Sequence, residues 1–503
     1  EMTMEHESTL PKDIAPELSK RAKKINMHKL ESVPWAHDGS HPGSAWFWKF
    51  ITTILLVPWS YLFRRKEVEK PHQTDGGRLC VATHVNGLVD PICITMSNPK
   101  QRMVTLGRHD LTTSVPVISW IARRIGSQPV IRKAEQIEGI AEAEFAHHLN
   151  QRSMLTVAHS LSGGYCAIIM PEGVGHQDSQ LRHLRTGSMR SAINAASIAK
   201  ERNIPPPVFQ PIGLHFRVHH WFRTDLYLEQ VEPVLVPHNP IKEDRQKLMK
   251  GIWVEPPEDL VLKLRDELTR KLAPISRDAP DWETYRSWQL LAHLVAINNG
   301  KKLSTYKKEV LATRNVREKI RQNNSPILQK KAIKASKILH SCDLDGRIIN
   351  NDLTISNKPN LIKGIFGLFI MILCSPLTVS STGIQALLAW YLGNKTDEGI
   401  DARTTYHMIA AMISPISIWP LVSLIYFIII DNIFFNLPAL SFPFFLIFSI
   451  FIYHYCNLLF LQGYDMWVDF KFTLNGKILN QSKDGSELIK LIEEINTNLD
   501  VLK

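Results

Sequence analysis

The long apolar runs of this chain are concentrated in one part of it, and this constrains the fold more than any other feature. Nearly all of them lie between residues 361 and 461. A transmembrane helix needs about 20 mostly apolar residues, and the runs 405–430 and 440–461 reach that length. A short polar connector separates the two runs. The pattern therefore predicts a membrane region over 361–462 that contains a transmembrane hairpin, 405–461.

Two further apolar stretches are weaker candidates for the membrane. The run 362–392 is interrupted by Pro376 and Gly383, so we expect a broken or hairpin-like segment there. The run 45–63 has aromatic residues and a basic end, but it contains a lysine and a proline and is barely long enough to span. We predict a membrane-associated segment over 44–66, which is either an interfacial or re-entrant helix or a full span.

The charged residues indicate on which side of a membrane the polar regions lie and what kind of partner the protein binds. The 59 Lys+Arg residues outnumber the 48 Asp+Glu residues, which gives a net charge of +11. The regions before 361 and after 470 are rich in Lys and Arg, which predicts that both lie on the cytoplasmic side of a membrane. No basic-aromatic recognition motif points to nucleic acid. We therefore expect an anionic lipid surface or a phosphorylated substrate as partner.

The average composition does not show that the chain combines a polar, basic part with an apolar membrane region. With 44% hydrophobic residues and a mean hydropathy of −0.10, the chain is close to an ordinary globular protein, which excludes collagen-like, disulfide-stapled and wholly disordered classes. Six scattered cysteines without a pairing or zinc spacing indicate a reducing compartment. No secretory signal is visible ahead of the first apolar run.

Residues 67–240 alternate between strand-like and helix-like stretches, which predicts an α/β fold with a mainly parallel sheet flanked by helices. A polar, basic arm (1–43) lies N-terminal to the first membrane-associated segment. A charged, helix-rich region (241–360) follows the α/β part, and 463–503 read as a polar tail with one amphipathic helix. The strand-like runs are 79–83, 103–106, 129–132, 165–170, 208–216 and 226–236; the helix-like stretches are 116–126, 142–161 and 188–200.

The first chemical motif joins a histidine to an aspartate. His84 follows an apolar strand, Asn86-Gly87 is a tight-turn dipeptide, and Asp90-Pro91 is a helix start. This order lets Asp90 fold back toward the imidazole, and a histidine held by a carboxylate is an oriented general base. A loop histidine beside a capping aspartate is the simpler alternative.

A second motif follows the buried strand 165–170. Glu172 and Gly173 come directly after it, at the edge where open α/β sheets bind ligands. Glu172 can accept hydrogen bonds from a polyol, while Arg182 and Arg185 precede a helix start and can hold a phosphate. An ordinary solvated loop with basic residues is the alternative.

Two more positions complete the set. Arg132 ends the strand 129–132, where a guanidinium can bind a phosphate through two parallel hydrogen bonds. Pro211 interrupts the apolar strand 208–216. Taken alone, a surface arginine at a strand end and a core strand are the simpler interpretations of these two positions, and each is favoured over the functional one.

Together and in this order, the four motifs resemble the glycerophosphate acyltransferase family, which includes glycerol-3-phosphate and lysophosphatidate acyltransferases. The usual first motif has four residues between His and Asp, whereas five separate His84 from Asp90 here. This variant resembles the branch of the fungal dual glycerol-3-phosphate/dihydroxyacetone-phosphate acyltransferases and related bacterial proteins. Arg132 is similar to the phosphate-binding arginine of the second motif, 171–173 to the third motif and 210–213 to the fourth. The resemblance covers about 70–236.

The resemblance implies transfer of an acyl chain from a thioester to a glycerol hydroxyl. His84 and Asp90 would be catalytic. Arg132 and Arg185 would clamp the phosphate, Glu172 with Gly173 would bind glycerol hydroxyls, and Pro211 belongs to the motif associated with the acyl donor. No metal or resident cofactor is expected, and the histidines near this site lack a convincing ligand spacing. The donor, acyl-CoA or acyl carrier protein, is a substrate.

Three hypotheses about the function are consistent with the sequence. The first is a membrane-bound glycerol-3-phosphate acyltransferase of phospholipid synthesis, with dihydroxyacetone phosphate as a second acceptor. The second is a lysophosphatidate acyltransferase, and the third a non-catalytic lipid-binding scaffold. The first two imply a catalytic domain that faces the cytoplasm, at a bacterial inner membrane or the endoplasmic reticulum. The sequence predicts no oligomeric state.

Overall fold

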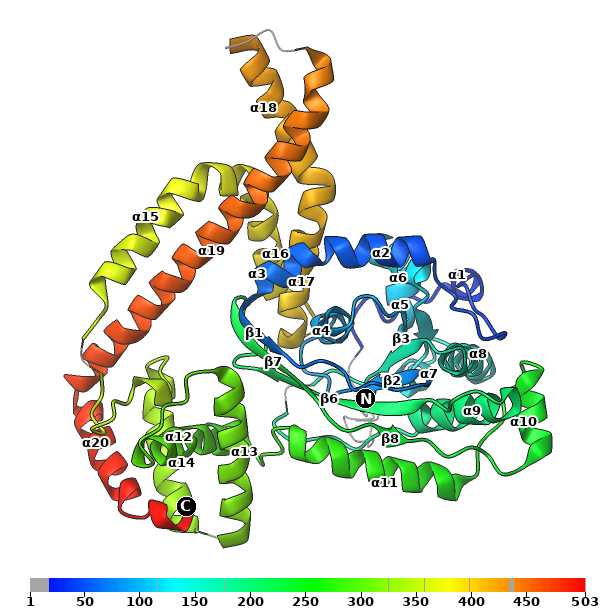
Figure 1. Cartoon of the computed structure of the whole chain (residues 1–503), viewed down its shortest axis with the longest axis horizontal. Helices are drawn as coiled ribbons and strands as arrows, with labels where there is room; N and C mark the ends of the chain where they lie inside the picture. The colour runs from blue at the N-terminus through cyan, green and yellow to red at the C-terminus, as the bar shows by residue number, and fades with distance from the viewer. Residues whose placement is uncertain are drawn as a thin grey trace, which may run out of the picture.

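The α/β segment forms a mainly parallel sheet. The computed structural model describes residues 18–114, 116–176, 178–323, 325–356, 358–397, 399–433 and 438–502. The strands found there are β1 (Phe63–Val68), β2 (Arg78–Val81), β3 (Met103–Arg108), β4 (Gln128–Val130), β5 (Cys166–Ile169), β6 (Val208–Phe216), β7 (Thr224–Gln230) and β8 (Val234–Leu235). Their order is β1-β7-β6-β2-β5-β3-β4, with β8 also paired to β6 (Figure 1). Strands β2 to β6 pair in parallel, and only β7 and β8 are antiparallel to β6. The expected fold class is confirmed.

Several boundaries differ from the sequence-based prediction. The segment expected at 44–66 ends early, because β1 begins at Phe63 and pairs in parallel with β7. The run 226–236 is two strands rather than one, because Pro233 cannot donate to a continuous ladder. The strand expected at 129–132 ends at Val130, so the arginine that follows lies beyond the sheet.

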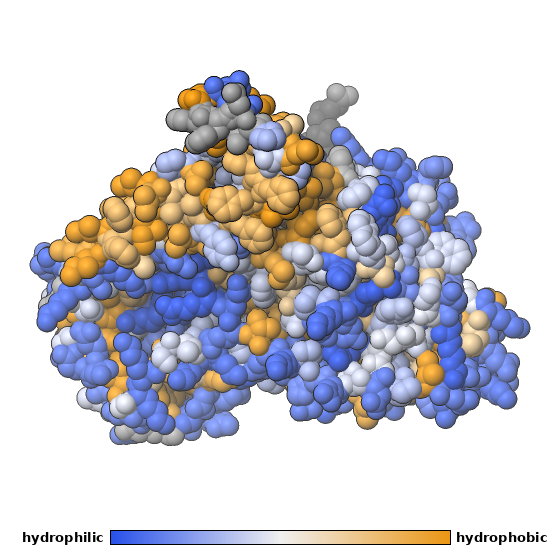
Figure 2. Space-filling view, turned by 45° about the horizontal axis from the view of Figure 1, so that its top comes forward, coloured by the Kyte–Doolittle hydropathy of each residue, from blue (hydrophilic) through white to orange (hydrophobic). Residues whose placement is uncertain are grey.

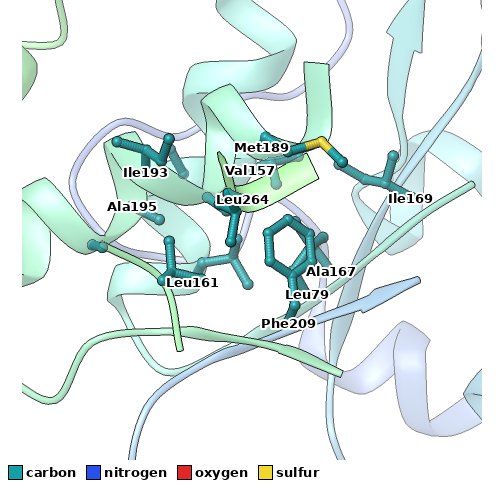
Figure 3. Close-up of a cluster of buried hydrophobic side chains, with 14 of the residues drawn as sticks. Leu79, Val157, Leu161, Ala167, Ile169, Met189, Ile193, Ala195, Phe209 and Leu264 are labelled. Carbon is teal, nitrogen blue, oxygen red and sulfur yellow. The ribbon is translucent and has the colours of Figure 1, made fainter. Parts of the chain in front are cut away.

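One face of the sheet is covered by three long helices, α8 (Ala143–Ser162), α9 (Gly187–Arg202) and α11 (Glu258–Ile275). Alternate residues of the strands point into this side, and Figure 3 shows Leu79, Ala167 and Phe209 against helix residues such as Leu161 and Leu264. These side chains are almost fully buried, and the larger ones, the leucines and the phenylalanine, each contribute about 1.5–3 kcal/mol by their removal from water. Helix α11 comes from the region 241–360, so part of that region belongs to the core of the α/β domain.

The other face is covered partly by the membrane region. Its core combines strand residues such as Cys80 and Ile168 with Leu62, Val89 and Met408. The last of these lies on α17, an apolar helix more than three hundred residues further along the chain than β2. The elements above this face in Figure 1 are α2 (Ala45–Ile54), α3 (Leu56–Leu62), α4 (Val89–Ser97) and α17 (Arg403–Ile413). The sheet is therefore not a separate soluble domain.

Most of the rest of 241–360 forms a helical unit with its own core. Its helices are α12 (Trp282–Asn298), α13 (Tyr306–Asn323), α14 (Pro326–Ser341) and α20 (Lys483–Asn496). The amphipathic helix expected within 463–503 is α20, whose apolar side packs into this core, and the residues before it continue the long helix α19 to Asn480. Ion pairs fasten the unit to the edge of the sheet: Arg217 binds Glu309 at 2.7 Å, and Arg314 binds Glu229 at 2.6 Å.

Three helical stretches of the described residues are long and apolar enough to cross a membrane: Leu361–Asn394, Arg403–Ile433 and Ala439–Asn480. They contain α15 (Leu361–Thr378), the π-helical turn η2 (Val379–Gly383), α16 (Ile384–Asn394), α17, the π-helical turn η4 (Ser414–Ile418), α18 (Trp419–Ile433) and α19 (Phe442–Asn480). Figure 1 shows the chain rising along α15 and returning along α16, and the break lies at η2, where Pro376 and Gly383 interrupt the run. Figure 2 shows hydrophobic residues gathered over this part of the molecule. Part of the expected connector 431–436 lies outside the described residues, as does the start of the arm 1–43.

Helix α19 continues well past the apolar region. Its 39 residues span about 58 Å, roughly twice the hydrocarbon core of a bilayer. In its second half, Asp469 pairs with Arg64 at 2.6 Å and also with Lys363, while Asp465 pairs with Arg223. These acidic residues tie α19 to α15, to β1 and to the turn between β6 and β7, so the membrane helices and the sheet are joined by charge as well as by packing.

The first apolar segment is two short helices rather than one long one. Helix α2 has 10 residues and spans about 15 Å, half the hydrocarbon core. Phe47 and Ile51 are buried against the protein, whereas Trp46 is 72% exposed and Phe50 37%. A helix that packs one side on the protein and exposes aromatic residues on the other fits the interfacial alternative better than the full span.

Glycines let α15 and α19 approach closely. A Cβ atom on Gly367 would lie 2.6 Å from the carbonyl oxygen of Gly463, and one on Gly463 would lie 2.7 Å from the carbonyl oxygen of Gly367. We therefore expect Gly367→Leu to force the helices apart and to cost about 1–3 kcal/mol or more of stability. Thermal unfolding in detergent measures this. Phe366→Leu, at a neighbouring side chain that is 52% exposed, is the control and should leave the Tm unchanged.

Candidate active site

His84 and Asp90 form a hydrogen-bonded pair at the carboxyl end of β2. Nδ1 of His84 lies 2.9 Å from Oδ2 of Asp90, whose side chain is fully buried. Because an ionised carboxylate can only accept, the contact requires the proton on Nδ1. The neutral ring then has its basic lone pair on Nε2, and the ring is 24% exposed. A base that is oriented by a buried carboxylate and open to solvent can take a proton from a substrate hydroxyl.

The loop between the two residues is folded around the same carboxylate. Oδ2 of Asp90 also accepts the backbone N–H groups of Val85 and Asn86, both at 2.8 Å. Gly87 has φ +47°, the left-handed conformation that favours glycine in a tight turn. Asp90 lies in the first turn of α4 rather than at its N-cap, which is Leu88. The carboxylate therefore satisfies the loop amides that precede the helix and fixes the imidazole at the same time.

Glu172 joins this loop to the one that follows β5. Its Oε2 accepts the backbone N–H of His84 at 3.0 Å and Nε2 of His176 at 2.8 Å, and its Oε1 accepts the backbone N–H of Arg182 at 3.0 Å. The backbone N–H of His176 donates in return to the carbonyl of His84 at 3.0 Å. Glu172 is 2% exposed. In the structure this carboxylate holds the loop that carries His84, whereas the sequence suggested a contact with substrate hydroxyls.

Gly173 and Arg185 are packed against each other in the same loop. Gly173 has φ +78°, and a Cβ atom there would lie 2.5 Å from Cδ of Arg185. Arg185 donates its backbone N–H to the carbonyl of Pro171 at 2.7 Å and its Nε to the carbonyl of Glu172 at 3.2 Å. Glycine at 173 thus makes room for the arginine, which is brought to the same loop cluster as His84.

Arg132 lies on the same edge of the sheet but further away. It caps α7 (Lys133–Ile137), and its Nε and Nη2 bind Oε1 of the buried Glu135 at 2.8 and 2.6 Å. Three strand spacings separate β2 from β4 in the sheet, which is about 14 Å. The structure therefore brings His84, Asp90, Glu172, Gly173 and Arg185 together, while Arg132 stands apart at the far end of this edge.

A second arginine stands between these two positions. Arg108 ends β3 and makes two hydrogen bonds to Asp110, at 2.6 and 2.7 Å. Burial raises the pKa of Asp110, but the hydrogen bonds and the positive charge of Arg108 lower it by more than burial raises it. The pKa of Asp110 is therefore below its usual value. The sequence did not indicate Arg108, because the strand was expected to end at 106. Nor did it indicate that His176 binds Glu172, since the spacing of the histidines near this site bore only on metal binding.

Pro211 is a buried residue of β6, paired in register with Val81 of β2. It lies beside the strand that delivers His84 rather than in the loop cluster, which matches the core-strand alternative for its local environment. Among the described ranges, no group of three or more His, Cys, Asp or Glu side chains is arranged to hold a metal ion.

Comparison with known proteins shows that the segment containing these residues matches a known protein family. Residues 64–214 match the family model described as Acyltransferase. These residues are a domain of the glycerophosphate acyltransferase superfamily. The matched acyltransferase domain contains every site residue predicted from the sequence, so the resemblance is confirmed.

Two proteins similar to this domain have names that specify a substrate, which the family description does not. Glycerol-3-phosphate O-acyltransferase 2 of Saccharomyces cerevisiae is 27% identical over 135 residues, which cover 27% of this chain but only 17% of the yeast protein. The crystal structure of the 1-acyl-sn-glycerophosphate (LPA) acyltransferase from Thermotoga maritima is similar over 44% of this chain and 79% of that chain, at 16% identity and a TM-score of 0.27. That similarity is too low to support an argument about site geometry or substrate.

Proposed function

We propose that this protein transfers a fatty acyl group from a thioester to the hydroxyl of glycerol-3-phosphate, and that dihydroxyacetone phosphate is a second acceptor. The observation that carries the chemistry is the 2.9 Å contact between Nδ1 of His84 and the buried carboxylate of Asp90. The choice of acceptor is supported by the name of the yeast relative and by the five-residue spacing of the first motif.

The reaction needs one base and no covalent enzyme intermediate. Nε2 of His84 takes the proton of the acceptor hydroxyl as its oxygen attacks the thioester carbonyl. The tetrahedral intermediate collapses, the C–S bond breaks, and the imidazolium returns the proton to the leaving thiolate. Asp90 keeps the ring in the required tautomer and stabilises the transient imidazolium, as the aspartate of a Ser-His-Asp triad does.

The arginines of this edge supply the positive charge for a phosphate. A guanidinium has five N–H donors, so the bonds from Arg132 to Glu135 leave it others for a ligand. We assign Arg132 and Arg185 to the acceptor phosphate and add Arg108, which lies on the strand between them. The proposed contacts of Glu172 and Gly173 with glycerol hydroxyls, and of Pro211 with the acyl donor, stay predictions.

The remaining proposals follow from the substrates. The donor, acyl-CoA or acyl carrier protein, and the acceptor are anionic, and the acyl product belongs in a bilayer, so the site should face the bilayer surface. The Lys- and Arg-rich flanks put the catalytic domain on the cytoplasmic side, at a bacterial inner membrane or the endoplasmic reticulum.

The deciding experiment is an acyltransferase assay on the purified full chain in lipid nanodiscs. Labelled acyl-CoA and acyl carrier protein are each tested with glycerol-3-phosphate, dihydroxyacetone phosphate and lysophosphatidate. We expect turnover with glycerol-3-phosphate. Turnover on lysophosphatidate alone would replace the acceptor assignment, and no turnover on any acceptor would favour the scaffold hypothesis.

Arg132→Ala is expected to raise the KM for glycerol-3-phosphate about 10-fold or more and to change kcat less, because a hydrogen-bonded charge pair contributes about 1.5–3 kcal/mol. Steady-state kinetics with varied acceptor measures this. Arg265→Ala, on α11 and paired only with its neighbour Asp266, is the control. An unaltered KM in Arg132→Ala would remove this residue from the phosphate site.

A further inference from the structure

The membrane helix α17 makes direct hydrogen bonds to the loop that carries His84. Oγ1 of Thr404 donates to Oδ1 of Asn86. One residue further along α17, Oγ1 of Thr405 accepts the backbone N–H of Leu88 at 3.2 Å. Asn86 is 1% exposed, Thr404 2% and Thr405 8%, so these bonds are shielded from water. Hydrogen bonds between buried groups are costly to break, because each broken bond leaves a polar atom without a partner.

Apolar packing continues the contact one turn further along α17. Met408 is 2% exposed and belongs to the same buried cluster as Val85 and Val89, which lie near the two ends of the loop between His84 and Asp90. The first two turns of α17 therefore cover the outer side of the loop with two hydroxyl groups and one apolar side chain.

The loop is held from two sides as a result. From the inside, the Asp90 carboxylate binds the backbone N–H groups of Val85 and Asn86. From the outside, α17 binds the side chain of Asn86 and the backbone of Leu88. Asn86 takes part in both sets of bonds, so its position links the helix to the carboxylate that orients His84.

We propose that Asn86, Thr404 and Thr405 are positioning residues, through which the membrane region holds the His84–Asp90 pair in its reactive geometry. None of the three needs to touch a substrate. The test of this inference by turnover rests on the proposed acyltransferase function. A displacement of about 1 Å in a catalytic group can cost 10²-fold in rate, so loss of the contact should reduce kcat rather than substrate binding.

The test compares the double variant Thr404→Val/Thr405→Val with wild type. Valine keeps the β-branched shape but removes the hydroxyl groups. We expect kcat to fall about 10- to 100-fold with both KM values within about 2-fold of wild type. Thr404→Ser/Thr405→Ser, which keeps the hydroxyls, should retain most of the wild-type activity. Thr378→Val on α15 is the matched control, because its hydroxyl has no hydrogen-bond partner among the described residues.

Hydrogen–deuterium exchange provides a readout that does not depend on turnover. In the double valine variant, peptides that cover 84–90 should exchange faster than in wild type, while peptides of β6 stay protected. Exchange that rises equally in β6 would mean general unfolding and would overturn the specific role. Unchanged exchange in 84–90, or a raised KM with unchanged kcat, would also overturn it. A wild-type protein that turns over no acceptor would refute the proposed function, and the exchange result would still decide the contact.

A double-mutant cycle built on single variants keeps the proposal testable if Thr404→Val/Thr405→Val fails to fold. Asn86→Ala removes the same hydrogen bond from the other side. If Thr404 acts through Asn86, the losses of kcat in Thr404→Val and Asn86→Ala should not add in the combined variant. Fully additive losses would mean that the two residues act independently, against the proposal.

Discussion

His84→Ala is expected to lower kcat about 10²- to 10⁴-fold, the usual contribution of a general base, while the acceptor KM changes little. The imidazole is 24% exposed, so we expect its truncation to leave no large cavity and the protein to stay folded. Single-turnover kinetics with labelled acyl donor would show whether the acyl-transfer step itself is slowed.

Asp90→Asn probes the same pair from the buried side. Oδ2 of Asp90 accepts from Nδ1 and from two backbone N–H groups. An amide nitrogen in its place would face these donors and favour the wrong tautomer, whereas an amide oxygen there would keep the bonds but lose the negative charge that stabilises the imidazolium. In both cases we expect a loss of kcat comparable to that of His84→Ala. Asp266→Asn, at a carboxylate on α11 that is 63% exposed, is the control. Unchanged turnover in His84→Ala would overturn the mechanism.

Glu172→Ala is expected to reduce both stability and kcat. It leaves three donors without their acceptor: the backbone N–H groups of His84 and Arg182, and Nε2 of His176. Each unsatisfied buried group costs about 1–3 kcal/mol, and the released loop should lower kcat about 100-fold. Glu172→Gln keeps one acceptor oxygen and should lose less of both. Thermal unfolding and steady-state kinetics measure the two effects.

The kinetic pattern of the Glu172 variants separates two roles for this residue. A residue that holds the loop lowers kcat and the Tm together, whereas a residue that binds glycerol hydroxyls raises the acceptor KM with the Tm unchanged. Glu255→Ala, which removes a carboxylate that is 52% exposed, is the control for loss of charge. A raised KM with an unchanged Tm would restore the interpretation drawn from the sequence.

Local patterns were enough to predict the α/β core. The alternation of strand-like and helix-like runs predicted the parallel sheet, and the Asn86-Gly87 dipeptide before Asp90 predicted that the carboxylate would fold back to His84. These features depend on residues that are neighbours in the chain. The helical unit was not predicted, because its core joins 279–355 to α20, and nothing local in either segment identifies the other as its partner.

The same limit explains why the contacts of Glu172, Thr404 and Thr405 were not predicted. Glu172 appeared from the sequence to face the substrate because it follows a strand, but its role in the structure depends on donors from two other stretches of chain. Thr404 and Thr405 lie in a segment that was recognised only by its apolar length. Their contact with Asn86 spans more than three hundred residues, and no spacing in a single sequence indicates it.

The order in which the chain is made has a consequence for how this molecule matures. A ribosome completes β2 and the His84 loop long before it reaches α17, which covers one face of the sheet, and α20, which closes the helical unit. Until then an apolar face of the sheet and part of a second core stay open to water, where they are prone to aggregation. The buried contacts around His84 can therefore be completed only after α17 has been made and packed against the sheet, and a chain in which this fails would keep an apolar surface exposed.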